Sequence, residues 1–187
     1  MAVFLTGFLL CVGGCETGEP QRGGMDVKLA HDQIEGAFGL KLGDVFETSN
    51  GQLNNQISLY LTYTFTPTNV VRKFERFSVA VTHNAHRICN ISAIATFRSL
   101  SDAQVEIDVL MNILQDKYGR EWRPSSGPAA DAIKASGMRA IRQGSRSITA
   151  RTRSTNEGAQ LILMYRDERL ERIAEKEAIQ RLDKSGL

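Results

Sequence analysis

Histidine and cysteine are the residues of this chain whose types and spacing could do chemistry. His83 and His86 stand at H-x-x-H spacing, and two imidazoles can bind a transition metal. A structural zinc site needs four ligands and a catalytic site three, yet no cysteine or carboxylate cluster lies near this pair in the sequence. We therefore interpret both histidines as exposed residues of a turn, and we predict no metal site.

Cys89 follows His86 by three residues, so the two could act as a nucleophile and its base. The thiol also belongs to an alternating apolar pattern with Ile91 and Ala93, which favours a buried and inert cysteine. Neither a G-x-S-x-G elbow nor a G-x-x-x-x-G-K-[ST] phosphate loop occurs. We predict no catalytic residue and no cofactor, although carboxylates brought together by the fold would be invisible at this level.

Arginine is unusually dense in the second half of the chain. Because arginine suits carboxylate and phosphate contacts at interfaces, we consider four of these residues as candidates for binding a partner: Arg142, Arg146, Arg151 and Arg153. The alternative is a solvated sheet face whose charge is balanced by the acidic last helix. The formal net charge is only +2, which argues against nucleic acid as the partner.

The first residues form a short apolar run, Ala2 to Val12, about as long as the core of a signal peptide and too short to span a bilayer. The run ends in Val12-Gly13-Gly14-Cys15, which resembles the lipobox of bacterial lipoproteins. The resemblance implies that residues 1–14 are a signal peptide and that Cys15 is acylated and becomes the mature N-terminus. The alternatives are a plain secretory signal or a buried first element of a cytosolic protein.

Residues 15–26 contain Pro20 and several glycines and have almost nothing to bury, so we interpret them as a flexible tether. Residues 27–187 then form a single α+β domain. Lipid on Cys15 would attach this domain to a membrane of the bacterial cell envelope, on the periplasmic side.

The elements of this domain follow from periodicity. Apolar residues alternate strictly over residues 57–65, which predicts a strand. Residues 74–82 and 87–97 predict a hairpin. A helix begins at Ser101, where Ser101 and Gln104 form a capping box, and it stops at Gly119. Its buried stripe has helical spacing: Ile107, Leu110, Met111, Leu114 and Tyr118.

Pro and Gly residues predict a loop over residues 123–137. A second hairpin (138–142 and 145–153), a strand (160–165) and a last helix capped by Asp167 complete the order. On that helix, the spacing predicts i,i+4 ion pairs of Glu168 with Arg172 and of Glu177 with Arg181. The fold class is α+β, an antiparallel sheet covered by helices, and the order of elements suggests two similar strand-strand-helix halves.

Composition agrees with a folded domain, since the 187 residues are 42% hydrophobic and 24% charged. Two of the three cysteines lie in the leader, which excludes a disulfide framework inside the domain. The sequence therefore favours a membrane-anchored envelope lipoprotein with a non-enzymatic binding or accessory domain, whose partner is a protein or another envelope component. The alternative is an envelope hydrolase whose active site is assembled from residues distant in sequence.

Overall fold

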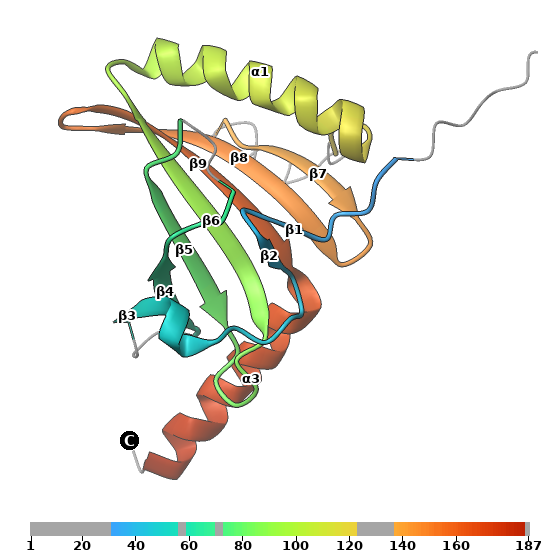
Figure 1. Cartoon of the computed structure of the whole chain (residues 1–187), viewed down its shortest axis with the longest axis vertical. Coiled ribbons are helices and arrows are strands. Elements are labelled where there is room, and N and C mark those ends of the chain that lie inside the picture. Colours follow the sequence, from blue (N-terminus) through green and yellow to red (C-terminus); the bar gives the residue numbers. More distant parts are fainter. Residues whose placement is uncertain (1–30, 56–58, 70–72, 123–136, 186–187) are drawn as a thin grey trace, which may run out of the picture. The chain divides into compact units, whose positions relative to one another are not determined.

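Two antiparallel sheets and two long helices make up the described part of the chain (Figure 1). This computed structural model describes residues 31–55, 59–69, 73–122 and 137–185. The α+β class and the order strands, helix, strands, helix are those expected from the sequence.

The larger sheet has seven strands in the order β3-β4-β5-β6-β9-β8-β7, and every neighbouring pair is antiparallel. The chain builds one half of the sheet up to β6, and then returns to place its last strand, β9, directly beside β6. The strands are β3 (Gly51–Asn55), β4 (Leu61–Phe65), β5 (Arg76–Val81), β6 (Ile88–Phe97), β7 (Arg139–Gln143), β8 (Arg146–Thr155) and β9 (Gly158–Asp167).

Alternation along these strands gives the sheet two different faces. On one face, Ile91 lies opposite Tyr165 and Ala93 opposite Leu163, and these four side chains belong to the hydrophobic core. The other face carries Asn90, Ser92, Met164 and Arg166 from the same two strands. A shift of one residue in register would exchange the two sets, so the apolar pattern fixes the pairing.

Helix α1 (Leu100–Tyr118) covers the apolar face. Its inward side buries residues at helical spacing: Ala103, Ile107, Met111, Leu114 and Tyr118. The helix ends at Gly119, whose φ of 99° suits a residue without a Cβ. The predicted cap at Ser101 is wrong, because the hydroxyl of Ser99 accepts the hydrogen bond from the Asp102 backbone N–H at 3.1 Å.

The small hairpin of β1 (Gly36–Ala37) and β2 (Leu40–Lys41) packs on the same face as α1, and the 3-10 helix η1 (Thr48–Asn50) follows it. Its two turn residues, Phe38 and Gly39, both have positive φ, 58° and 88°, as a type I′ turn requires. A positive φ strains a bulky residue such as Phe38. The Phe38 ring is buried and packs edge-on against Phe77 at 5.1 Å between centroids, which offsets that strain.

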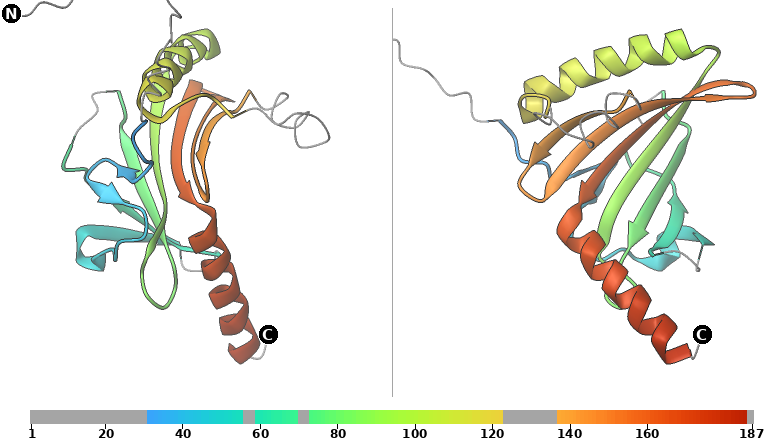
Figure 2. Two further views of the ribbon diagram at one scale, coloured as in Figure 1. Left: turned by 90° about the vertical axis from the view of Figure 1, so that its right-hand side faces the viewer. Right: turned by 180° about the vertical axis from the view of Figure 1, so that it is seen from behind.

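Helix α3 (Glu168–Ser185) packs at one end of the opposite face, so the two helices do not share a side of the sheet. In the left view of Figure 2, β1 and β2 lie on one side of the sheet and α3 on the other. Asp167 caps α3, because its Oδ1 accepts hydrogen bonds from the backbone N–H groups of Arg169 and Leu170. This confirms the predicted cap.

Several predicted details differ in the structure. Strand β4 begins at Leu61 rather than at residue 57, and residues 56–58 lie outside the described residues. Strand β3 was not predicted. Neither i,i+4 ion pair forms on α3: the Glu168 carboxylate pairs with Arg142, Arg172 donates to the Glu168 backbone carbonyl, and Arg181 contacts His83. Most of the predicted loop, residues 123–136, also lies outside the described residues.

Candidate interaction surfaces

The predicted lipidation site, Cys15, lies outside the described residues, as do the signal peptide over residues 1–14 and the tether over 15–26. The anchor therefore stays a prediction. Within the described ranges, no helix has both the length and the apolar character needed to cross a membrane.

The four arginines considered as partner-binding residues separate onto two faces of the larger sheet. Arg142 lies opposite Ser147 in the β7–β8 ladder, and Arg151 and Arg153 follow Ser147 at even spacing on β8. These three arginines therefore share the face that does not carry α1. Arg146 points to the other face, so the structure does not gather all four into one patch.

The three arginines that share a face differ in what they contact. Arg142 Nη2 donates to Glu168 Oε2 at 2.6 Å, an ion pair with the last helix. Arg153 Nη2 donates to Gln160 Oε1 at 2.8 Å on the neighbouring strand. Arg151 is exposed and makes no ion pair within the described part of the chain. Arg151 and Arg153 are thus the cations of this face most open to a partner, and their role in binding stays a prediction.

Arg146 joins three segments that are distant in sequence. Its Nε donates to Asp167 Oδ2 at 3.3 Å, its Nη1 to the carbonyl of Ile34 at 2.9 Å, and its Nη2 to the carbonyl of Leu42 at 3.2 Å. Asp167 is 1% exposed, so its carboxylate has almost no water to solvate it. Because a buried charge needs a partner, Arg146 is explained by the fold itself and not by a ligand.

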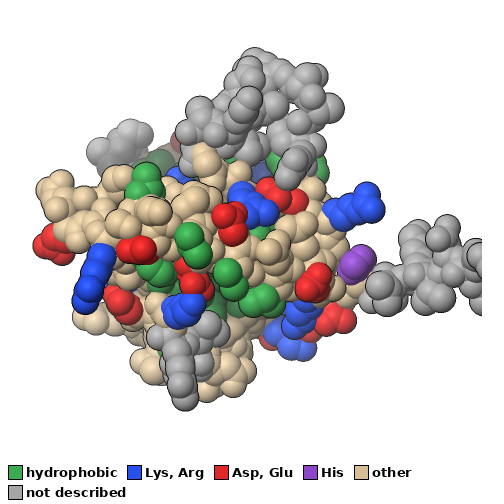
Figure 3. All heavy atoms as spheres, turned by 90° about the horizontal axis from the view of Figure 1, so that it is seen from above, with side chains coloured by type: hydrophobic (Ala, Val, Ile, Leu, Met, Phe, Trp, Pro, Cys, Tyr) green, Lys and Arg blue, Asp and Glu red, His purple; other side chains and the backbone are tan. Residues whose placement is uncertain are grey.

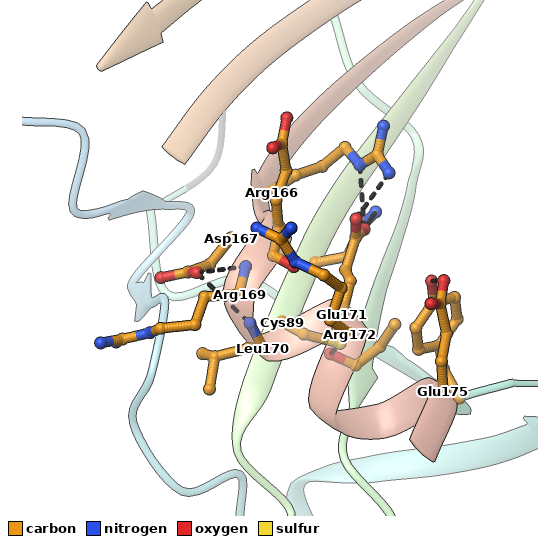
Figure 4. A network of polar contacts seen from close by, with 12 residues as sticks. Cys89, Arg166, Asp167, Arg169, Leu170, Glu171, Arg172 and Glu175 are labelled. Atoms are coloured by element: carbon orange, nitrogen blue, oxygen red, sulfur yellow. Dashed lines mark hydrogen bonds and ion pairs between the residues drawn. The ribbon is translucent and has the colours of Figure 1, made fainter. Parts of the chain in front are cut away.

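A second buried carboxylate attaches α3 to the sheet (Figure 4). Arg166 donates from Nε and Nη2 to the two oxygens of Glu171, at 2.9 and 2.5 Å, and Asn90 Nδ2 donates to the same carboxylate at 3.4 Å. Tyr60 reaches Glu175 one turn further along the helix, at 3.5 Å. Burial, reinforced by the charges of Glu171 and Glu175, raises the pKa of Tyr60 to about 12.

Cys89 is fully buried beside this network, which confirms the predicted burial of the thiol. Its Sγ–H donates to the carbonyl of Ala80 at 3.2 Å. Burial, together with the nearby negative charge of Glu171, raises the pKa of the thiol to about 12. Because only the thiolate is a strong nucleophile, Cys89 is poorly suited to covalent chemistry.

The expectation of two exposed turn histidines is wrong for His83, which is 8% exposed. Helix α3 lies against the turn: Arg181 Nη1 is 2.8 Å from His83 Nδ1, and the backbone N–H of Asn84 donates to Glu177 at 3.1 Å. His86 is half-buried and has a φ of 48°. Over the described ranges, no three His, Cys, Asp or Glu side chains are grouped so that they could hold a metal ion.

A hollow of about 620 Å³ lies between the β1–β2 hairpin and the end of α1. Its charged lining residues pair with one another, Lys41 with Glu35 at 3.2 Å and Lys117 with Asp32 at 3.9 Å. Neither His nor Ser is among the described residues that line it. The convergence of carboxylate, His and Ser that would mark a hydrolytic site is therefore not found at this hollow.

The outward face of α1 presents apolar residues that the sequence analysis did not single out. Val105, Val109 and Ile113 are 62%, 48% and 60% exposed. Figure 3 views the molecule from the side that carries α1, and hydrophobic side chains lie there among acidic ones. The signal in the sequence was three β-branched residues at i,i+4 spacing on the side of the helix opposite its buried stripe.

Scans against models of protein families, curated proteins and solved structures found no match for this chain. The surfaces described above are therefore interpreted from their own geometry and chemistry.

Proposed function

We propose that this protein is a lipoprotein of the bacterial cell envelope, attached to a membrane through lipid on Cys15. Its domain, in the periplasm, binds a protein partner or another envelope component and does not catalyse a reaction. The observation that carries this proposal is the sequence Val12-Gly13-Gly14-Cys15, which stands between a short apolar run and a Gly-rich polar stretch.

The physical requirements of such an anchor agree with this order. The small residues Gly13 and Gly14 let a peptidase approach the backbone at the cut before Cys15. Each buried methylene of an acyl chain contributes about 0.8 kcal/mol, so two or three chains hold a protein stably where one is marginal. A slack tether then lets the folded domain move away from the membrane surface.

A binding role is supported by how the described chain uses its titratable groups. The buried carboxylates of Asp167 and Glu171 are each engaged by an arginine, and the Cys89 thiol is held in its protonated form. The carboxylates stabilise contacts between segments of the fold, and the thiol bonds to a neighbouring strand. The exposed side chains of α1 and of β8, by contrast, are available to a partner.

The test is the processing of the chain at Cys15. We expect mass spectrometry of the membrane fraction to find a mature chain that begins at Cys15 and carries acyl groups. The Cys15→Ser variant should remain uncleaved and unacylated. Cys11→Ser is the matched control, because Cys11 lies in the same leader and should be dispensable. If the Cys15→Ser chain is still processed and still sediments with membranes as the parent does, the proposal is wrong.

A further inference from the structure

Five residues form one line along the outward face of α1, which we call the outer stripe: Asp102, Val105, Val109, Ile113 and Asp116. Steps of four residues turn a helix by about 40°, so the three apolar side chains stay within one sector. Asp102 precedes Val105 by three residues and Asp116 follows Ile113 by three, which keeps both carboxylates in the same sector. An apolar stripe thus has an acid at each end.

The three apolar residues of the outer stripe and Asp116 do not stabilise the domain that carries them, whereas Asp102 lies in the first turn of α1, where the helix dipole favours a negative charge. Valine and isoleucine are weaker helix formers than the Gln, Glu or Lys usual at exposed positions, and these three gain little burial in exchange. Asp116 lies in the last turn of α1, where the helix dipole disfavours a negative charge. Residues that lower the stability of a helix without gaining burial or a contact in exchange indicate a functional surface.

The remaining acids of α1 are already neutralised, which isolates the two at the ends of the stripe. Glu106 pairs with Lys73, and Arg139 bridges Asp108 to the chain that follows the helix. Asp102 and Asp116 are exposed, and neither makes an ion pair within the described part of the chain. Their charges are therefore open to a partner.

Charge decides which occupant fits. A second copy placed antiparallel across a two-fold axis at Val109 would set each Asp102 against the Asp116 of the other copy, because the two lie seven residues from the centre on either side. A parallel copy would oppose like residues. Both arrangements bring carboxylates together, which is unfavourable. A partner with a cation at each end of its apolar stripe is complementary instead.

We propose that the outer stripe of α1 docks an amphipathic helix of another protein, whose apolar stripe ends on both sides in Lys or Arg. This inference rests on the proposed function as an anchored binding domain and names the surface and the partner's chemistry. The 14 residue-to-residue steps from Asp102 to Asp116 span about 21 Å at the helical rise. Two helices packed at a small crossing angle therefore place the partner's cations about four turns apart.

The experiment measures binding of defined peptides to the full chain, captured through a C-terminal tag on a sensor surface. The probe is a helical peptide with Leu at i, i+4 and i+8 and with Lys three residues outside each end of that run. A second peptide has Glu in place of both Lys. The first variant is Val105→Gln/Val109→Gln/Ile113→Gln, captured at equal density, so that binding to the leader or to detergent cancels in the comparison.

We expect the Lys peptide to bind the parent at least tenfold more tightly than the triple Gln variant, and the Glu peptide to bind weakly to both. The variant Asp102→Asn/Asp116→Asn should lose the preference for Lys over Glu and most of the salt dependence. This second variant changes only exposed charges. If the triple Gln variant does not fold, the peptide preference of this second variant is the test of the proposal.

Three results would overturn the inference: equal affinity of the Lys peptide for parent and triple variant, no binding to either, or tight binding of the Glu peptide. Self-association of the parent through the outer stripe would also overturn it, because the occupant would then be a second copy. These measurements do not depend on acylation, so a failure here is distinguishable from a failure of processing at Cys15.

Discussion

Removing the guanidinium of Arg146 should be among the most damaging single substitutions in the domain. Arg146→Met keeps the length of the side chain but leaves the Asp167 carboxylate, which is 1% exposed, without its charge partner. Breaking a buried ion pair from one side typically costs ~3–5 kcal/mol. The carbonyls of Ile34 and Leu42 also lose their donor. We expect the free energy of unfolding to fall by about 3–5 kcal/mol.

Companion variants separate the parts of this contact. Asp167→Asn keeps a side chain that can cap α3 and removes only the charge, so it should cost about 1–3 kcal/mol. Arg146→Lys should cost less than Arg146→Met, because it keeps a cation for Asp167, but one ammonium cannot reach three acceptors placed for a guanidinium fork. Arg153→Met is the matched control on the same strand, and an exposed substitution of this kind should change stability by roughly 0.5 kcal/mol or less.

The assay is urea unfolding of the full chain followed by circular dichroism, with equal m-values as the check on comparability. A double-mutant cycle between the two sites should give a coupling energy of about 0.5–3 kcal/mol. If Arg146→Met costs no more than the Arg153→Met control, the buried ion pair does not hold these segments together, and the reasoning is refuted.

Three further predictions concern the core and the contact of α3. Because the pKa of Cys89 is raised in the folded chain, the thiol of the unfolded chain ionises first as pH rises. Stability should therefore fall between about pH 9 and 12, at up to about 1.4 kcal/mol per pH unit. Cys89→Ala should lack this part of the slope, and an alkylating reagent at pH 8 should label Cys89 only when the chain unfolds. Glu171→Gln removes a negative charge that raises the pKa of Tyr60, so ultraviolet titration of the variant should show that pKa below its parent value of about 12. Phe38→Asn relieves the positive-φ strain but removes a buried ring. Burying a phenylalanine contributes roughly 1.5–3 kcal/mol, and the variant also loses an aromatic contact. The melting temperature of the variant should therefore drop; a rise would show that strain dominates.

The central strands were predictable because apolar and polar residues alternate along them, as they do in a strand with one buried face. The hairpin of β5 and β6 was identified closely, and so was β8. Strand β3 was missed because it is an edge strand whose sequence, Gly51–Asn55, holds one aliphatic residue. The cap of α1 was misplaced by two residues, since Ser99 and Ser101 are equally good caps locally and the packing of Ala103 and Ile107 sets where the helix begins.

The candidate surfaces were harder to predict, because each depends on what another segment covers. His83 is buried and contacts Arg181, which lies 98 residues further along the chain. Arg146 and Arg151 are the same residue type five positions apart on β8. Because side chains alternate between the faces of a strand, an odd separation places Arg146 in contact with Asp167 and Arg151 in solvent on the other face. The outer stripe was visible as sequence, but only the exposed fractions show that nothing described covers it.

The pairing of β6 with β9 has a consequence for biosynthesis. These ten-residue strands meet at the centre of the sheet, and 60 residues, 98–157, separate the end of β6 from the start of β9. The ribosome must therefore synthesise nearly the whole chain before β6 and β9 can pair, and contacts between residues so distant in sequence form slowly. Until then β6 offers a bare, aggregation-prone edge, so an emerging or truncated chain should depend on a chaperone that shields it.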